Sequence, residues 1–149
     1  MSEDAIIMLE NVSTVYEGET RPSLKGINLT FKKNDLVYIV GPNASGKTTL
    51  IETINGLLPA FKGKVTVFGL DLKSNGKKIR CQIGYVPQDF MVKPEEPYKA
   101  LDVVLMGKYG QIGFLHQPED KDKQEALESM KLIGIEDLAD KAMGKLSGG

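Results

Sequence analysis

Short stretches rich in apolar and β-branched residues occupy the first part of the chain. Residues 6–12 and 27–33 are strand-like, and the polar stretch 17–23 between them contains Gly18 and Pro22. Glycine and proline favour turns because they supply backbone angles that most residues disfavour. We therefore expect an antiparallel pair of strands joined by a loose hairpin.

A continuous apolar run at residues 36–40 is followed by apolar positions at helical spacing. The run is short, β-branched and aromatic, which predicts a buried parallel strand. Proline at position 59 ends the helical spacing. The apolar positions of this expected helix are Leu50, Ile51, Ile54, Leu57 and Leu58.

Three further stretches follow this helix. Residues 64–68 predict another strand, which Gly69 ends. The basic stretch 73–78 predicts a solvated surface turn. Residues 83–86 predict a short apolar strand that leads through a proline into Gln88.

From about residue 98 onward the pattern becomes helical. Pro118 suits the first turn of the second helix, the acidic residues that follow it complement the positive end, and Gly134 suits the C-terminal cap. We expect a loop at residues 107–117 and a short third segment at residues 136–143. The two apolar stripes are Ala100, Leu101, Val104 and Leu105, and then Ala126, Leu127, Met130 and Ile133.

The segment between the run at 36–40 and its helix carries the most specific chemistry. It has the spacing of a phosphate-binding loop, in which glycines let successive N–H groups turn toward phosphate oxygens at a positive helix end. We expect Lys47 to reach the β- and γ-phosphates, Thr48 to ligate Mg²⁺, and Thr49 to add a phosphate contact. The predicted nucleotide-binding residues of this loop are Gly41, Pro42, Asn43, Ala44, Ser45, Gly46, Lys47, Thr48 and Thr49.

Composition indicates which partners and which compartment to expect for this protein. Nineteen basic against twenty acidic residues provide no electrostatic footprint for nucleic acid, so we expect no nucleic-acid partner. Cys81 stands alone, which excludes an internal disulfide framework. No apolar run is long enough to cross a bilayer and the start is acidic, which predicts a cytoplasmic protein. His116, the single histidine, is expected to be a surface residue.

The order of several motifs resembles the ATP-binding domain of ABC transporters. An aromatic Tyr16 precedes GPNASGKTT at 41–49, IGYVPQ follows and ends at Gln88, and LSGG occupies 146–149. Residues 100–109 look most similar to ATPase subunits of bacterial and archaeal importers of metal ions and metal chelates.

The resemblance implies roles for residues outside the loop. Tyr16 is similar to the aromatic that stacks on adenine, although a strand tyrosine packed for structural reasons is the alternative. Gln88 matches the glutamine that reaches Mg²⁺ and the attacking water while its loop contacts the membrane subunit. The signature motif, which contacts ATP held by the opposite protomer, matches Leu146, Ser147, Gly148 and Gly149.

The resemblance also implies a fold. It is an α/β P-loop NTPase fold with a RecA-like core at residues 35–61 and 79–90. An N-terminal antiparallel β subdomain is expected at residues 1–34 and 62–72, and a helical subdomain at 98–149 that runs up to the signature motif.

The family pattern continues beyond the last residue of the chain. The Mg²⁺-binding aspartate, the catalytic glutamate and the switch histidine of the family all follow the signature motif, so we expect the C-terminal part of the core to be missing. The strands between residues 36–40 and 83–86 also come from that later sequence in the family. We therefore expect no catalytic residue within this chain, and we expect the 149 residues alone to be unstable and inactive.

The function implied by the resemblance is that of an ATP-binding subunit. It would couple ATP binding and hydrolysis, with Mg²⁺, to import of a metal ion or metal chelate through a membrane permease. The subunit would dimerise and lie peripherally at the inner face of the membrane, without a transmembrane segment. The alternatives are a soluble ABC ATPase acting on ribosomes, DNA repair or Fe–S assembly, and a nucleotide-binding fragment without turnover.

Overall fold

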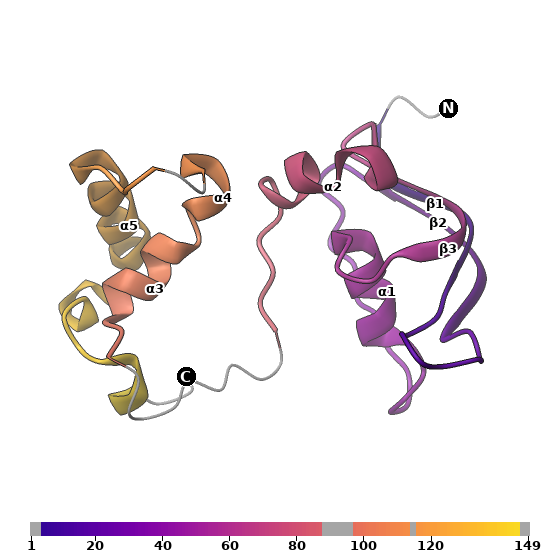
Figure 1. The fold of residues 1–149 in the computed structure, drawn as a ribbon, viewed down its shortest axis with the longest axis horizontal. Coiled ribbons are helices and arrows are strands. Elements are labelled where there is room, and N and C mark those ends of the chain that lie inside the picture. Colours follow the sequence, from indigo (N-terminus) through magenta and orange to yellow (C-terminus); the bar gives the residue numbers. More distant parts are fainter. Residues whose placement is uncertain (1–3, 88–96, 114–115, 147–149) are drawn as a thin grey trace. The chain divides into compact units, whose positions relative to one another are not determined.

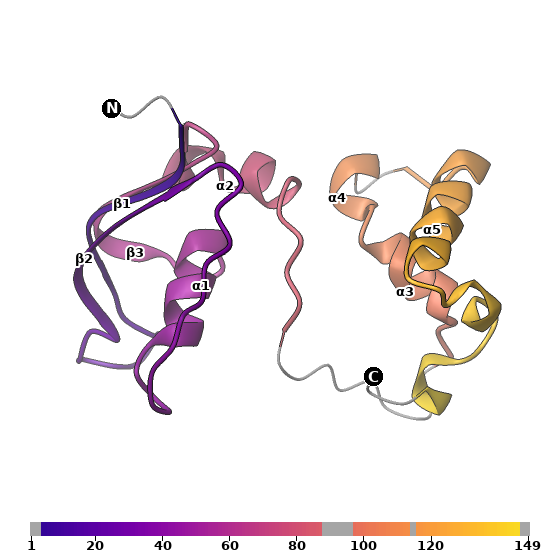
Figure 2. The same ribbon diagram turned by 180° about the vertical axis from the view of Figure 1, so that it is seen from behind.

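The computed structural model describes residues 4–87, 97–113 and 116–146 (Figures 1 and 2). The chain divides into two compact units, Met1–Tyr85 and Val86–Gly149. The first unit contains a sheet with two helices, and the second is helical. We describe each unit by itself.

An antiparallel sheet forms the framework of the first unit. Its strands are β1 (Ala5–Thr14), β2 (Leu24–Lys32), β3 (Ala60–Val67) and β4 (Leu70–Asp71), in the order β2-β1-β3-β4. The pairing of β1 with β2 confirms the predicted antiparallel pair. The strand predicted at residues 64–68 is also confirmed as part of β3, which pairs antiparallel with β1.

A β-bulge at Asn11 decides which side chains of β1 enter the core. The register between β1 and β3 shifts between Glu10 and Ser13, and Asn11 has a positive φ of 51°. One extra residue reverses the alternation of side chains along a strand. As a result Leu9 and Val12 are both buried, whereas Asn11 is exposed.

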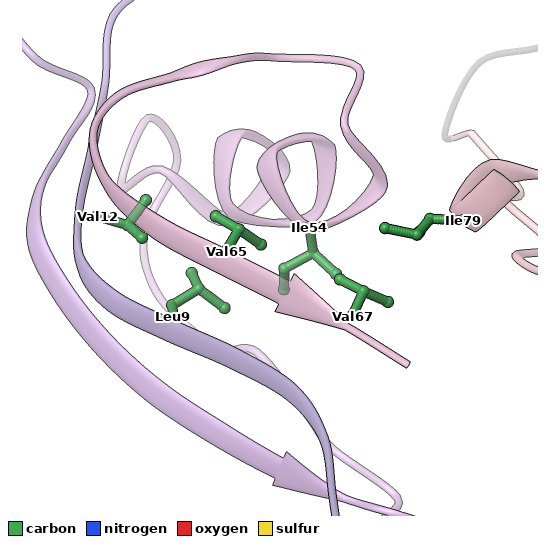
Figure 3. Close-up of a cluster of buried hydrophobic side chains, with 6 residues drawn as sticks. All are labelled: Leu9, Val12, Ile54, Val65, Val67 and Ile79. Atoms are coloured by element: carbon green, nitrogen blue, oxygen red, sulfur yellow. The ribbon is translucent and has the colours of Figure 1, made fainter. Parts of the chain in front are cut away.

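Two helices cover the buried face of this sheet. They are α1 (Lys47–Asn55) and α2 (Leu72–Arg80). Figure 3 shows Ile54 of α1 beside Val65 and Val67 of β3, with Ile79 of α2 at the end of the cluster. The helix predicted after the loop is therefore confirmed, and the left-handed Gly56 caps its C-terminus.

The basic stretch 73–78, predicted as a surface turn, is instead the middle of α2. Asp71 caps this helix by accepting a hydrogen bond from the N–H of Ser74 at 3.2 Å. Ile79 is fully buried and anchors the last turn to the core. The prediction failed because the cap and the anchor lie outside the basic stretch, whose own residues include Gly76 and the non-helical Asn75.

The strands predicted at residues 36–40 and 83–86 do not form. Both segments are irregular in the structure, and the side chains of Leu36, Tyr38 and Val40 are 81%, 80% and 88% exposed. An apolar run favours extended backbone, but a strand also needs a neighbour for its N–H and C=O groups. None of the described strands lies beside either segment.

The second unit is built from helices α3 (Ala100–Met106), α4 (Tyr109–Ile112) and α5 (Asp120–Leu132), followed by the short 3₁₀ helices η1 (Glu136–Leu138) and η2 (Met143–Lys145). Ala100, Met130 and Ala139 form its buried cluster. Both predicted helices are confirmed, and Gly134 follows α5 in the left-handed conformation. The second apolar stripe is only partly buried: Ala126 and Met130 are buried, whereas Leu127 and Ile133 are exposed.

Two details of the second unit differ from the sequence prediction. The expected loop at 107–117 contains the single helical turn α4. Pro118 precedes α5 instead of standing in its first turn, because Glu119 is the N-cap and its N–H donates to Asp122 at 2.9 Å. The carboxylates of Asp122 and Glu125 also accept hydrogen bonds from the ammonium group of Lys108. These hydrogen bonds raise the pKa of Lys108, and the one to Glu125 has the larger effect.

Among the helices of the described residues, none combines the length and the apolar character that a membrane span requires.

We predict that Gly63→Ala destabilises the protein far more than Gly69→Ala. Both glycines have positive φ, 85° and 73°, so alanine at either costs about 1–2 kcal/mol. A Cβ at Gly63 would also lie 2.4 Å from the carbonyl oxygen of Asn11 in the bulge, whereas one at Gly69 meets nothing within 4 Å. We expect an additional loss of about 1–3 kcal/mol for Gly63→Ala.

Urea unfolding of the full-length protein measures this difference. Gly69→Ala is the matched control, because Gly69 is exposed in the tight turn between β3 and β4. Equal midpoints for the two variants would contradict the close packing of β3 on the bulge.

Candidate functional site

The loop at residues 41–46 leads directly into the N-terminus of α1. Gly46 is the N-cap residue, with φ 88°, and it has no side chain to cap the first turn of the helix. The first N–H groups of a helix carry no intrahelical partner and a partial positive charge. This end of α1 can therefore donate hydrogen bonds to an anion.

The loop also contains an unusual backbone conformation. Ala44 has a positive φ of 60°, although it is not glycine. This conformation costs an alanine about 1–2 kcal/mol, so the surrounding loop must impose it. Gly46 is required for a different reason. A Cβ at this position would lie 3.1 Å from the side chain of Leu24 and 3.2 Å from the carbonyl oxygen of Ser23.

Lys47 is held across the loop by its own side chain. Its ammonium group donates hydrogen bonds to the carbonyl oxygens of Gly41 at 2.9 Å and Pro42 at 2.7 Å. The positive charge thus lies beside the N-terminus of α1, where both features favour an anion. Thr48, next in the chain, is exposed, whereas Thr49 is buried at 5% exposure.

A pocket of about 390 Å³ opens over this loop. Its volume lies within the range of small-molecule sites, about 300–1,000 Å³. The lining residues are Tyr16, Glu19, Pro22 and Ser23 from the connection between β1 and β2, together with Ala44, Ser45, Gly46, Lys47, Thr48 and Thr49. Folding of the sheet therefore brings Tyr16 to the predicted phosphate loop, about thirty residues further along the chain.

The hydroxyl group of Tyr16 is tied to α1. It donates a hydrogen bond to the carboxylate of Glu52 at 2.9 Å and lies 3.2 Å from the hydroxyl oxygen of Thr49. The hydrogen bond to Thr49 lowers the pKa of Tyr16, but burial and the hydrogen bond and charge of Glu52 outweigh it, so the net pKa is raised. The hydroxyl group of Tyr16 consequently stays protonated at physiological pH and can donate its hydrogen bond to Glu52.

Several predicted site residues lie outside the described residues. These are Gln88 and three members of the signature motif, Ser147, Gly148 and Gly149. Leu146 is described, and it follows η2 as its C-cap residue. The roles expected for these residues remain predictions.

The single histidine has the exposure expected from the sequence. His116 is exposed and Cys81 is half-buried. Within the described ranges, no group of three or more histidine, cysteine or acidic residues is arranged to hold a metal ion.

Sequence reasoning missed Glu52 and the residues of the β1–β2 connection. Glu52 lies three positions after Thr49, on the same face of α1, and this spacing is a signal that the sequence already contained. Glu19, Pro22 and Ser23 carried no comparable signal, because only the path of the connection brings them to the pocket.

The sequence of the chain is similar to those of proteins from one known family. A sequence model of the family described as "ABC transporter" matches residues 24–149. The chain is 41% identical over 143 residues to the manganese transport system ATP-binding protein MntB of Bacillus subtilis, covering 96% of this chain and 55% of that protein. It is 34% identical over 143 residues to the zinc transport system ATP-binding protein TroB of Treponema pallidum, covering 96% and 52%.

Solved structures agree with the sequence comparison. The dimeric structure of an ATP-binding cassette in a post-hydrolysis state, bound to ADP and Pi, matches with a TM-score of 0.78 and 28% identity, over 95% of this chain and 63% of that chain. The P-loop NTPase fold class predicted from the sequence is thereby confirmed. The chain spans about half the length of the curated relatives that it matches. It belongs to the ABC transporter family.

Proposed function

We propose that this chain is the nucleotide-binding portion of an ATPase subunit that drives metal-ion import through a membrane permease. The observation that carries the proposal is the pocket in which Lys47, the uncapped N-terminus of α1 and Tyr16 meet. The names of the similar proteins, which specify manganese and zinc transport, support the metal-ion substrate.

The residues of the pocket suit different parts of ATP. Lys47 and the first N–H groups of α1 would bind the phosphates through charge-assisted hydrogen bonds. The exposed hydroxyl of Thr48, together with Gln88, would hold Mg²⁺, which neutralises charge on the phosphates. Tyr16 offers an aromatic face for the adenine. Thr49 is buried at 5% exposure and its hydroxyl oxygen lies 3.2 Å from the hydroxyl of Tyr16, so it is less available to a phosphate than Thr48.

Two partners complete the proposed assembly. A second copy of the subunit would provide its signature motif, residues 146–149, to the nucleotide bound here, and the dimeric cassette structure supports this arrangement. A permease would contact the segment around Gln88, so that the subunit lies at the inner face of the membrane. The transport names of the relatives favour this assembly over a soluble ABC ATPase without a permease.

Loss of the lysine charge should weaken nucleotide binding strongly. We expect Lys47→Ala in the full-length protein to reduce ATP affinity by about 10- to 150-fold, which corresponds to about 1.5–3 kcal/mol for a hydrogen bond to a charged group. Titration with a fluorescent ATP analogue measures the change, and Lys33→Ala, an exposed lysine outside the pocket, is the control. Unchanged affinity in Lys47→Ala would refute the nucleotide site.

Glu52 should act through the orientation of Tyr16. We expect Glu52→Ala to weaken ATP binding about fivefold, since one hydrogen bond contributes about 1 kcal/mol. Glu52→Gln keeps an acceptor and should retain most of the affinity.

Tyr16→Ala should weaken the binding of ATP and of GTP to different extents. Parallel titrations with both nucleotides test this, with Glu10→Ala as an exposed control; identical affinities in all variants would count against an aromatic platform.

The segment around Gln88 should affect coupling more than binding. We expect Gln88→Ala to leave ATP affinity nearly unchanged and to lower permease-stimulated hydrolysis, because an amide can contact both metal and partner without adding charge. Phosphate release from reconstituted complexes measures the effect, with Gln82→Ala as the matched glutamine control. Normal basal and stimulated rates in Gln88→Ala would show that the coupling role is wrong.

A further inference from the structure

A second pocket lies at the opposite end of α1 from the nucleotide site. It has a volume of about 500 Å³ and is formed by the C-cap of α1 at Gly56, the start of β3, and α2. The residues that line it include none of those that line the pocket over the phosphate loop. The two pockets are therefore separate sites within the first unit.

Positively charged side chains surround this second pocket. Lys64 comes from β3, and Lys73, Lys77 and Arg80 come from α2. Asp71 is the one carboxylate of the lining, and it is engaged with the N–H and the hydroxyl group of Ser74 at 3.2 and 2.8 Å. The lining thus carries a net charge of +3.

Among the described residues, these cations have no acidic partner. Across residues 4–87, no ion pair involves Lys64, Lys73, Lys77 or Arg80. Like charges that converge on one space repel one another, and an anion between them relieves the repulsion. The arrangement therefore favours a negatively charged ligand.

The side chain of Arg80 is hydrogen-bonded to the backbone at the end of α1. Its guanidinium donates a hydrogen bond to the carbonyl oxygen of Gly56 at 3.2 Å. The absence of side chains at Gly56 and Gly76 makes room for it, because a Cβ at these positions would lie 3.3 and 3.1 Å from Nη1 of Arg80. This hydrogen bond uses one of five N–H donors, so the guanidinium can still bind an anion.

We propose that this pocket binds a small anion that carries two phosphate groups. The volume is that of a small-molecule site. A phosphate monoester carries a charge of about −1.5 to −2 at neutral pH, so two phosphate groups match the net charge of the lining, whereas a single carboxylate does not. Arginine and lysine are the side chains that recognise phosphate most often.

Inorganic pyrophosphate is a suitable probe for this site in the full-length protein. The phosphate loop is first saturated with a non-hydrolysable ATP analogue, and pyrophosphate is then titrated while the amide resonances of the glycines are followed by NMR. Gly56 and Gly76 report on the second pocket, and Gly41 and Gly46 on the phosphate loop. We expect saturable shifts at Gly56 and Gly76 alone.

Charge reversal provides the matched comparison. Lys73→Glu combined with Lys77→Glu should weaken pyrophosphate at least tenfold, and Arg80→Lys should weaken it less while leaving the fold intact. Lys25→Glu combined with Lys33→Glu changes the net charge equally on exposed positions outside the pocket, and it should have no effect. Three results would overturn the proposal: shifts confined to Gly41 and Gly46, equal weakening in both double variants, or equal shifts with sulfate at the same ionic strength.

Discussion

Burial of one face of α1 against the sheet is the constraint on which the first unit depends. Ile54 lies in one buried cluster with Leu9 and Val65, and each such side chain removed from water contributes about 1.5–3 kcal/mol. Because a short helix moves as one unit, this packing fixes the positions of both ends of α1 relative to the sheet. Lys47 then stands at the predicted phosphate loop, and Gly56 stands at the basic pocket.

Polar contacts add orientation to this hydrophobic packing. The hydroxyl of Tyr16 connects the β1–β2 connection to Glu52, while the hydroxyl of Thr53 donates to the carbonyl oxygen of Thr49 inside the core at 2.7 Å. Neither bond contributes much net stability, since each replaces a bond to water. Their effect is to fix one side of the pocket over the predicted phosphate loop relative to α1.

The two ends of α1 differ in what they offer to a ligand. At the N-terminus the backbone itself is positive, and the ammonium group of Lys47, the first residue of α1, adds a positive charge that the loop carbonyls hold in place. At the C-terminus the backbone is negative, and the carbonyl oxygen of Gly56 is satisfied by Arg80. Positive charge at this end therefore comes entirely from side chains of α2 and β3, which makes it sensitive to substitution.

Sequence alone determined the parts that depend on neighbouring residues: the glycine-rich loop that leads into α1, α1 itself, the pairing of β1 with β2, and the helices of the second unit. Spacing and turn residues encode these features locally. Tertiary structure decided the rest. Residues 36–40 are apolar enough for a strand but have no described neighbour to pair with, and α2 forms from a basic stretch because Asp71 caps it and Ile79 is buried. Hydrogen-bond partners and burial come from distant segments, so no local pattern contains them.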